Sequence, residues 1–97
     1  MFGWFDASRA EEFGTSLAKS LIEKIPLDKK LTEAKFASAA EHVLTKMSDQ
    51  IVAFKQSEKL NFYKTAKLGN AFRWTLKDAG YNEALTEKLV EWLVANL

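Results

Sequence analysis

Apolar side chains recur at the period of an α-helix along four stretches of the chain, and this periodicity constrains the fold more than any other sequence feature. The clearest stretch contains Phe36, Ala40, Val43, Leu44, Met47, Ile51 and Phe54. From Phe36 to Phe54 the pattern makes five turns in 18 residues, which is the 3.6-residue period of a straight helix and not the 3.5-residue period of a coiled coil. We therefore expect helices that pack inside a globule.

Local signals mark where these helices begin and end. Ser8 and Glu11 have the spacing of a capping box at the start of the first helix. Pro26 ends that helix because proline disfavours the helical conformation of the residue before it. Thr32 is the expected N-cap of the second helix, and polar residues 56–61 separate it from the third.

The corner between the last two helices has its own signals. Gly80 suits the left-handed conformation that often ends a helix, and Asn82 suits the N-cap of the helix that follows. The expected helices are residues 8–25, 32–56, 61–79 and 82–96. Because short connections join helices with one apolar side, we predict an all-α, antiparallel four-helix bundle-like fold.

The length of 97 residues fits one domain, spanning residues 1–97. Its N-terminal segment 1–7 is rich in aromatic residues, and we expect it to pack on the bundle as a lid. The expected buried side of the first helix is Ala10, Phe13, Leu17, Leu21 and Ile25, and that of the third is Phe62, Ala66, Gly69, Phe72, Leu76 and Ala79. Gly69 weakens a helix by about 1 kcal/mol relative to alanine, so we expect a close helix crossing there.

The last helix has more apolar surface than one core-facing side needs. Its inward face is expected to contain Leu85, Leu89, Trp92 and Leu93. Val90, Val94 and Leu97 extend this face well beyond the roughly 100° arc of an ordinary surface helix. The helix is therefore either central in the domain or part of an interface with a protein partner or a second copy. The candidate interface residues are Trp4, Val90, Val94 and Leu97.

The third helix is basic, because residues 60–80 carry four basic side chains and one acidic one. Aromatic rings interleaved with ammonium groups suit single-stranded nucleic acid or another anionic ligand. The candidate face contains Tyr63, Lys64, Lys67, Asn70, Arg73, Trp74 and Lys77. Two structural alternatives stay open: the aromatic rings cover a neighbouring element, and Arg73 pairs with Glu87 or Glu91.

The last two helices superficially resemble a helix-turn-helix, but the acidic last helix argues against entry into the major groove. No arrangement typical of an enzyme, cofactor or metal site is found in the sequence. Cysteine is absent, and His42, the single histidine, falls opposite the apolar side of its helix without a recognisable ligand pattern. No apolar run approaches the roughly 20 residues of a membrane span, and no secretory signal is recognised, so we expect a cytoplasmic protein.

These observations predict a non-enzymatic helical interaction module without cofactor or metal. It is expected to self-associate as a homodimer, or to bind a protein partner, through its C-terminal helix. The alternative is binding of nucleic acid or an anionic ligand through the basic and aromatic face of residues 59–77.

Overall fold

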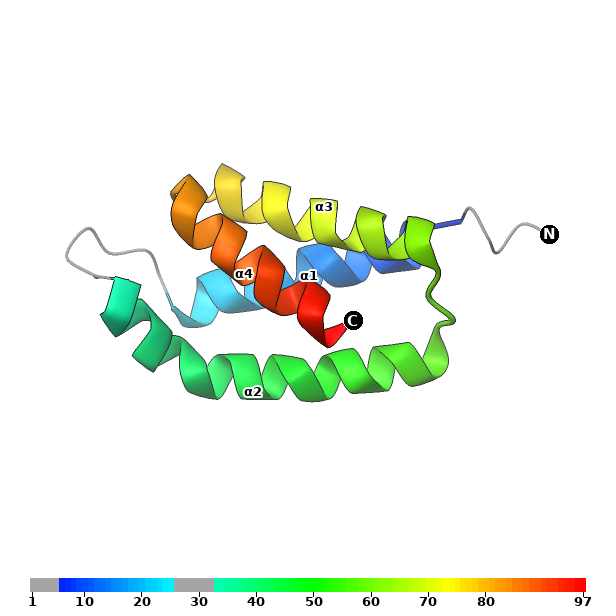
Figure 1. Cartoon of the computed structure of the whole chain (residues 1–97), viewed down its shortest axis with the longest axis horizontal. Helices are drawn as coiled ribbons and strands as arrows, with labels where there is room; N and C mark the ends of the chain where they lie inside the picture. The colour runs from blue at the N-terminus through cyan, green and yellow to red at the C-terminus, as the bar shows by residue number, and fades with distance from the viewer. Residues whose placement is uncertain (1–5, 26–32) are drawn as a thin grey trace.

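The computed structural model describes residues 6–25 and 33–97, which form four helices and no strand. The helices are α1 (Ser8–Lys24), α2 (Glu33–Ser57), α3 (Phe62–Asp78) and α4 (Glu83–Asn96). Successive helices run in opposite directions (Figure 1). The predicted all-α four-helix fold is confirmed, and each observed helix end lies within one residue of its expected place. Pro26, Thr32 and the aromatic residues of segment 1–5 lie outside the described residues.

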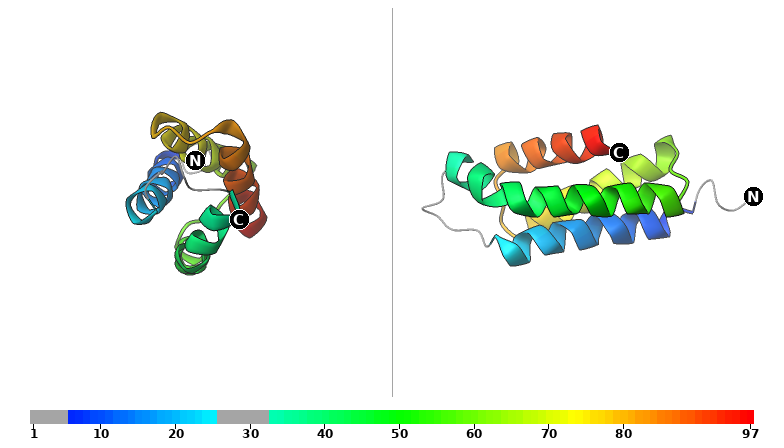
Figure 2. Two further views of the ribbon diagram at one scale, coloured as in Figure 1. Left: turned by 90° about the vertical axis from the view of Figure 1, so that its left-hand side faces the viewer. Right: turned by 90° about the horizontal axis from the view of Figure 1, so that it is seen from below.

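The helices surround the core in the order α1, α3, α4, α2, as the view along the long axis shows (Figure 2). The most extensive contact is between α1 and α3, which run in the same direction although α2 separates them in the chain. Gly14 permits this contact. A Cβ atom at Gly14 would collide with the carbonyl oxygen of Leu68 and would lie 3.4 Å from the Cβ atom of Ala71.

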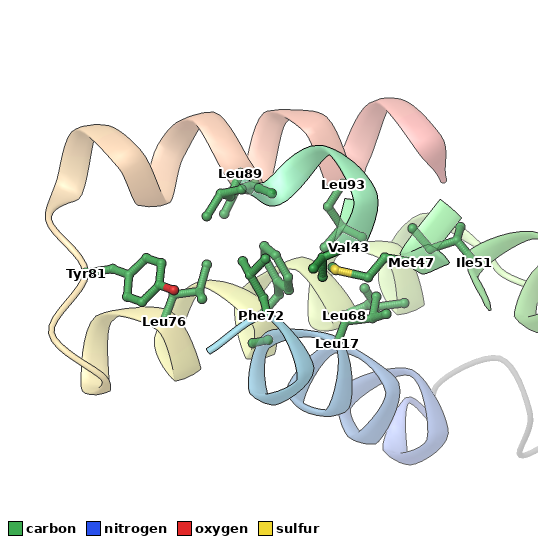
Figure 3. Packing of buried hydrophobic residues seen from close by; sticks show 14 of the residues in the cluster. Leu17, Val43, Met47, Ile51, Leu68, Phe72, Leu76, Tyr81, Leu89 and Leu93 are labelled. Atoms are coloured by element: carbon green, nitrogen blue, oxygen red, sulfur yellow. The ribbon is translucent and has the colours of Figure 1, made fainter. Parts of the chain in front are cut away.

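Most of the expected apolar sides do face the core. Leu17 and Leu21 of α1, and Met47 and Ile51 of α2, are almost completely buried. They meet the buried residues Leu68, Phe72, Leu76, Leu89 and Leu93 of α3 and α4 (Figure 3). Phe13 stacks on Phe54 with ring centroids 4.1 Å apart, which joins α1 to α2 at the edge of the core.

The buried side of α3 differs from the predicted one. Phe62, Ala66 and Ala79 are exposed, with 91% of Phe62 accessible, whereas Leu68 and Lys64 are buried. The expected close crossing at Gly69 is also wrong, because nothing lies within 4 Å of a Cβ atom built there. The close crossing is at Gly14 of α1 instead. This contact orients α3 so that the side of the helix that carries Phe62 faces away from α1.

The capping box predicted at Ser8 is absent. The helix already includes Ser8, Ala7 is its N-cap residue, and no side-chain cap is formed there. Instead, the Ser8 amide donates to Oδ1 of Asp6 at 3.2 Å. This hydrogen bond lowers the pKa of the Asp6 carboxyl, because it favours the charged form.

The corner between α3 and α4 forms as predicted. Gly80 has a φ of 98°, and Oδ1 of Asn82 accepts the Leu85 amide at 2.8 Å. The amides of Gly80 and Tyr81 donate to the carbonyls of Lys77 and Leu76, which is the hydrogen-bond pattern of a Schellman motif. This motif directs Tyr81 inward beside Leu76 (Figure 3). The buried Tyr81 hydroxyl donates to the Ile25 carbonyl at 3.1 Å, tying the corner to the end of α1.

We predict opposite effects of the same substitution at the two helical glycines. Gly14→Ala should lower the free energy of unfolding by about 1–3 kcal/mol, because α1 and α3 must move apart to admit the methyl group. Gly69→Ala is the matched control. It should raise the free energy of unfolding by up to about 1 kcal/mol, because its Cβ meets no neighbour and alanine has a higher helix propensity than glycine. Urea unfolding of dilute protein measures both. Equal losses in the two variants would contradict the crossing at Gly14.

Burial raises the pKa of the Tyr81 phenol. The unfolded chain loses this proton near pH 10, its usual pKa being about 10, while the folded chain retains it. Stability should therefore fall as the pH rises above about 10. Tyr81→Phe should lower the free energy of unfolding by about 1 kcal/mol at neutral pH and should weaken the alkaline loss. Unfolding curves of wild type and Tyr81→Phe across this pH range test both effects.

Candidate functional site

An apolar groove lies between α3 and α4 and has a volume of about 320 Å³. Its lining contains Phe62, Thr65, Ala66, Gly69, Asn70 and Arg73 of α3, and Val90 and Val94 of α4. The two helices meet at the Tyr81 corner and diverge from it, so that the far end of α4 lies toward α2 (Figure 1). There, Ser48 Oγ of α2 donates to Asn96 Oδ1 at 3.4 Å, and Lys55 Nζ donates to the Asn96 carbonyl oxygen at 3.4 Å.

The side chains of the groove differ in size in a way that leaves both a protrusion and a hollow. Phe62 is 91% exposed at the N-terminal end of α3. Ala66 and Gly69, one and two turns further along α3, are small, and the space above Gly69 is open. Val94 is 50% exposed on the opposite wall, while Val90 is buried at its base. A groove with this lining can accept an apolar side chain.

An ion pair lies beside the groove. Nη2 of Arg73 lies 3.1 Å from Oε2 of Glu87, which confirms the pairing of Arg73 with a carboxylate of α4. Both side chains remain more than a third exposed, so the pair contributes little to stability. Nε of Arg73 is buried and finds no hydrogen-bond partner among the described residues. The pair connects a basic helix to an acidic one, because α4 carries three glutamates and one lysine.

The predicted partner interface is only partly on this groove. Val90 is 7% exposed and belongs to the core, and Leu97 is half-buried against it. Val94 is the member that lies in the groove and is accessible. Trp4 lies outside the described residues. Phe62 and Ala66 were not predicted as interface residues, because helical periodicity assigned them to the core.

The basic and aromatic face lies on the outer side of α3, beside the groove. Tyr63, Lys67, Asn70, Trp74 and Lys77 follow this side of the helix, and Trp74 is 60% exposed. Nζ of Lys67 lies 5.5 Å from the centroid of the Tyr63 ring, and Nζ of Lys77 lies 5.6 Å from that of Trp74. Each ammonium group therefore forms a cation–π contact with an aromatic ring of its own helix.

Lys64 does not belong to this outer face. Its side chain is 7% exposed, and Nζ lies 3.2 Å from Oε1 of Glu58, which is itself 14% exposed. Oε2 of Glu58 also pairs with the exposed Arg9 at 3.3 Å. Removing one partner from a buried ion pair leaves an uncompensated charge and destabilises by about 3–5 kcal/mol. Lys64 therefore holds the start of α3 to the residue that follows α2, and its ammonium group is engaged in this pair.

A second hollow lies on the surface of α1. It has a volume of about 700 Å³ and is lined by Ser8, Glu11, Glu12, Thr15, Ser16, Lys19, Ser20 and Glu23. All of these residues belong to α1, so the hollow is the solvent-facing side of a single helix. His42 is exposed, as predicted. Within residues 6–25 and 33–97, no group of three or more histidine, aspartate or glutamate side chains could hold a metal ion.

None of the helices in the described part of the chain combines the length and apolar character that crossing a membrane requires. No protein-family model, curated protein or solved structure matches this sequence or this fold.

Proposed function

We propose that the chain is a non-enzymatic protein-interaction module whose docking surface is the groove between α3 and α4. The observation that carries this proposal is the 91% exposure of Phe62 next to an apolar hollow. Among the described residues, the exposed large apolar side chains are Val52, Phe62, Trp74 and Val94. Phe62 and Val94 lie together on the walls of one groove, which is the arrangement expected of a binding surface.

Energetics favour occupation of this groove by a partner. Full burial of a phenylalanine or valine side chain is worth about 1.5–3 kcal/mol relative to leaving it in water. In the isolated chain Phe62 gains almost none of this free energy, because its side chain is exposed. A partner that covers Phe62 and inserts an apolar side chain above Gly69 would recover it on both sides of the interface. Aromatic anchors of this kind dominate the binding energy of many protein interfaces.

Selection of peptides that bind the folded chain, from a library of random sequences, tests this proposal. The selected peptides should carry apolar anchor residues and should bind Val94→Asp at least about tenfold more weakly, because the new carboxylate would be desolvated in the groove. Val52→Asp is the matched control, since Val52 is similarly exposed but lies on α2. Equal binding to wild type, Val94→Asp and Val52→Asp would contradict the proposal.

The exposure of Trp74 favours a second candidate function, the binding of single-stranded nucleic acid to the outer face of α3. Lys67 and Lys77 supply positive charge for phosphates on the same face, whereas Lys64 and Arg73 are already paired with glutamates. The groove is favoured over this face because both aromatic rings here already contact an ammonium group of α3.

If this second function is present, single-stranded DNA should quench the fluorescence of Trp74, and added salt should weaken the binding. Trp74→Phe identifies the responding tryptophan, because the chain contains three. A paired charge reversal, Lys67→Glu with Lys77→Glu, should abolish the binding. Fluorescence that does not respond to single-stranded DNA at low salt would rule this function out.

A further inference from the structure

We propose that the outer face of α3 holds a single-stranded polynucleotide at two positions, with one base stacked on Trp74 and another on Tyr63. This inference rests on the second candidate function. It adds how the strand lies on the face, how long the strand must be and which cations hold its phosphates. Three observations carry it: the two rings are aligned along α3, each has an ammonium group beside it, and the other two cations of the helix are paired with glutamates.

The two rings lie in one line along the helix. Trp74 follows Tyr63 by 11 residues, which is three helical turns to within about 20° around the helix axis. At a rise of about 1.5 Å per residue, the two positions are about 16 Å apart along α3. Asn70 lies between them on the same side of the helix and is exposed. A strand that runs along α3 can therefore place bases over both rings, with the Asn70 amide between them.

Each ring and its ammonium group form a unit that suits one nucleotide. Nζ of Lys77 lies 5.6 Å from the centroid of Trp74, and Nζ of Lys67 lies 5.5 Å from that of Tyr63. Trp74 is nonetheless 60% exposed, so its contact with Lys77 leaves the indole accessible to a base. A cation–π contact at an exposed site is weak, whereas a phosphate offers the ammonium group a full negative charge. The base can therefore stack on the ring while the phosphate lies at the ammonium group.

The ion pairs of α3 set the number of phosphate contacts. The helix carries four basic residues, but Lys64 and Arg73 are already paired with glutamates. Lys67 and Lys77 form no ion pair within the described residues. Two phosphates should therefore be neutralised. For a single strand this corresponds to a slope of about −1.4 when the logarithm of the binding constant is plotted against that of the salt concentration.

The separation of the rings sets the length of the strand. A stacked strand advances about 3.4 Å per nucleotide, so about five steps cover the distance between the rings, and a more extended strand needs fewer. A dinucleotide is too short to reach both rings. It should lie on Trp74, because Tyr63 is half-buried. An octanucleotide can reach both.

Titrations with the thymidine dinucleotide and octanucleotide at low salt, followed by the NMR shifts of the α3 amides, test the two positions. Trp74→Leu keeps apolar bulk but removes the planar ring, and should weaken both oligonucleotides at least about fivefold. Tyr63→Leu should weaken the octanucleotide at least about fivefold and leave the dinucleotide unchanged. His42→Leu removes an exposed ring from α2 and should change neither.

The salt dependence of octanucleotide binding tests the phosphate contacts. The wild-type slope should be about −1.4, and Lys67→Glu with Lys77→Glu should abolish the binding. Lys19→Glu with Lys24→Glu makes the same change of net charge at exposed positions of α1 and should leave most of the binding intact. A slope of about −2.8, expected if all four α3 cations hold phosphates, would overturn the assignment of two contacts.

Failure of this inference can be told apart from failure of the second candidate function. A wild-type chain that binds neither oligonucleotide at low salt overturns both. If the wild-type chain binds but Tyr63→Leu leaves the octanucleotide unaffected, or weakens both oligonucleotides equally, the strand is not held at two positions. The inference is then overturned, and the outer face of α3 remains a nucleic-acid surface.

Discussion

The close approach of α1 and α3 at Gly14 is the contact on which the remaining architecture depends. The backbones meet there so closely that the carbonyl of Leu68 occupies the position of a side chain on α1. Two parallel helices joined in this way bury Leu17, Leu68 and Phe72 on one side. Parallel neighbours cannot be consecutive in a chain with short connections, so α2 and α4 must return along the opposite side of the core. The order α1, α3, α4, α2 follows from this arrangement.

The same contact leads to the candidate binding groove. Because Leu68 faces α1, the side of α3 that carries Phe62 faces α4. Helix α4 would therefore have to cover Phe62 for that side chain to be buried. Helix α4 has 14 residues, and its far end contacts Ser48 and Lys55 of α2. It therefore covers the part of α3 near the corner and leaves Phe62 and Ala66 accessible. The apolar surface proposed for binding is the part of α3 that α4 does not reach.

Sequence reasoning was most successful where the signal is local. The Gly80 turn, the Asn82 cap and the break after Ser57 depend on a few neighbouring residues, and all were predicted. The pairing of Arg73 with a carboxylate of α4 was one of the two interpretations of this residue, because largely buried arginines are usually paired, and it is the one observed. The capping box failed because Asp6, two residues earlier, supplies the acceptor for the Ser8 amide.

The side of α3 that is buried could not be predicted from its own residues. Its apolar residues cover more than half of the helix circumference, so periodicity allows Phe62 and Ala66, or Leu68, to face the core. The choice depends on where α1 lies, and the Gly14 contact that sets it is long-range. Gly14 and Gly69 both lie inside helices, and only the packed structure distinguishes the one that is needed for close approach. The groove was missed for the same reason, although Val94 on its other wall was identified.

The most direct test of this account is the proton–proton distance across the Gly14 contact, measured by nuclear Overhauser effects in the folded protein. A strong effect is expected between the α protons of Gly14 and the methyl group of Ala71, because a Cβ atom at Gly14 would lie 3.4 Å from the Cβ atom of Ala71. If Gly14 instead shows effects only to side chains of α2, the parallel pair of α1 and α3 is absent. The derivation of the groove from that pair would then be wrong.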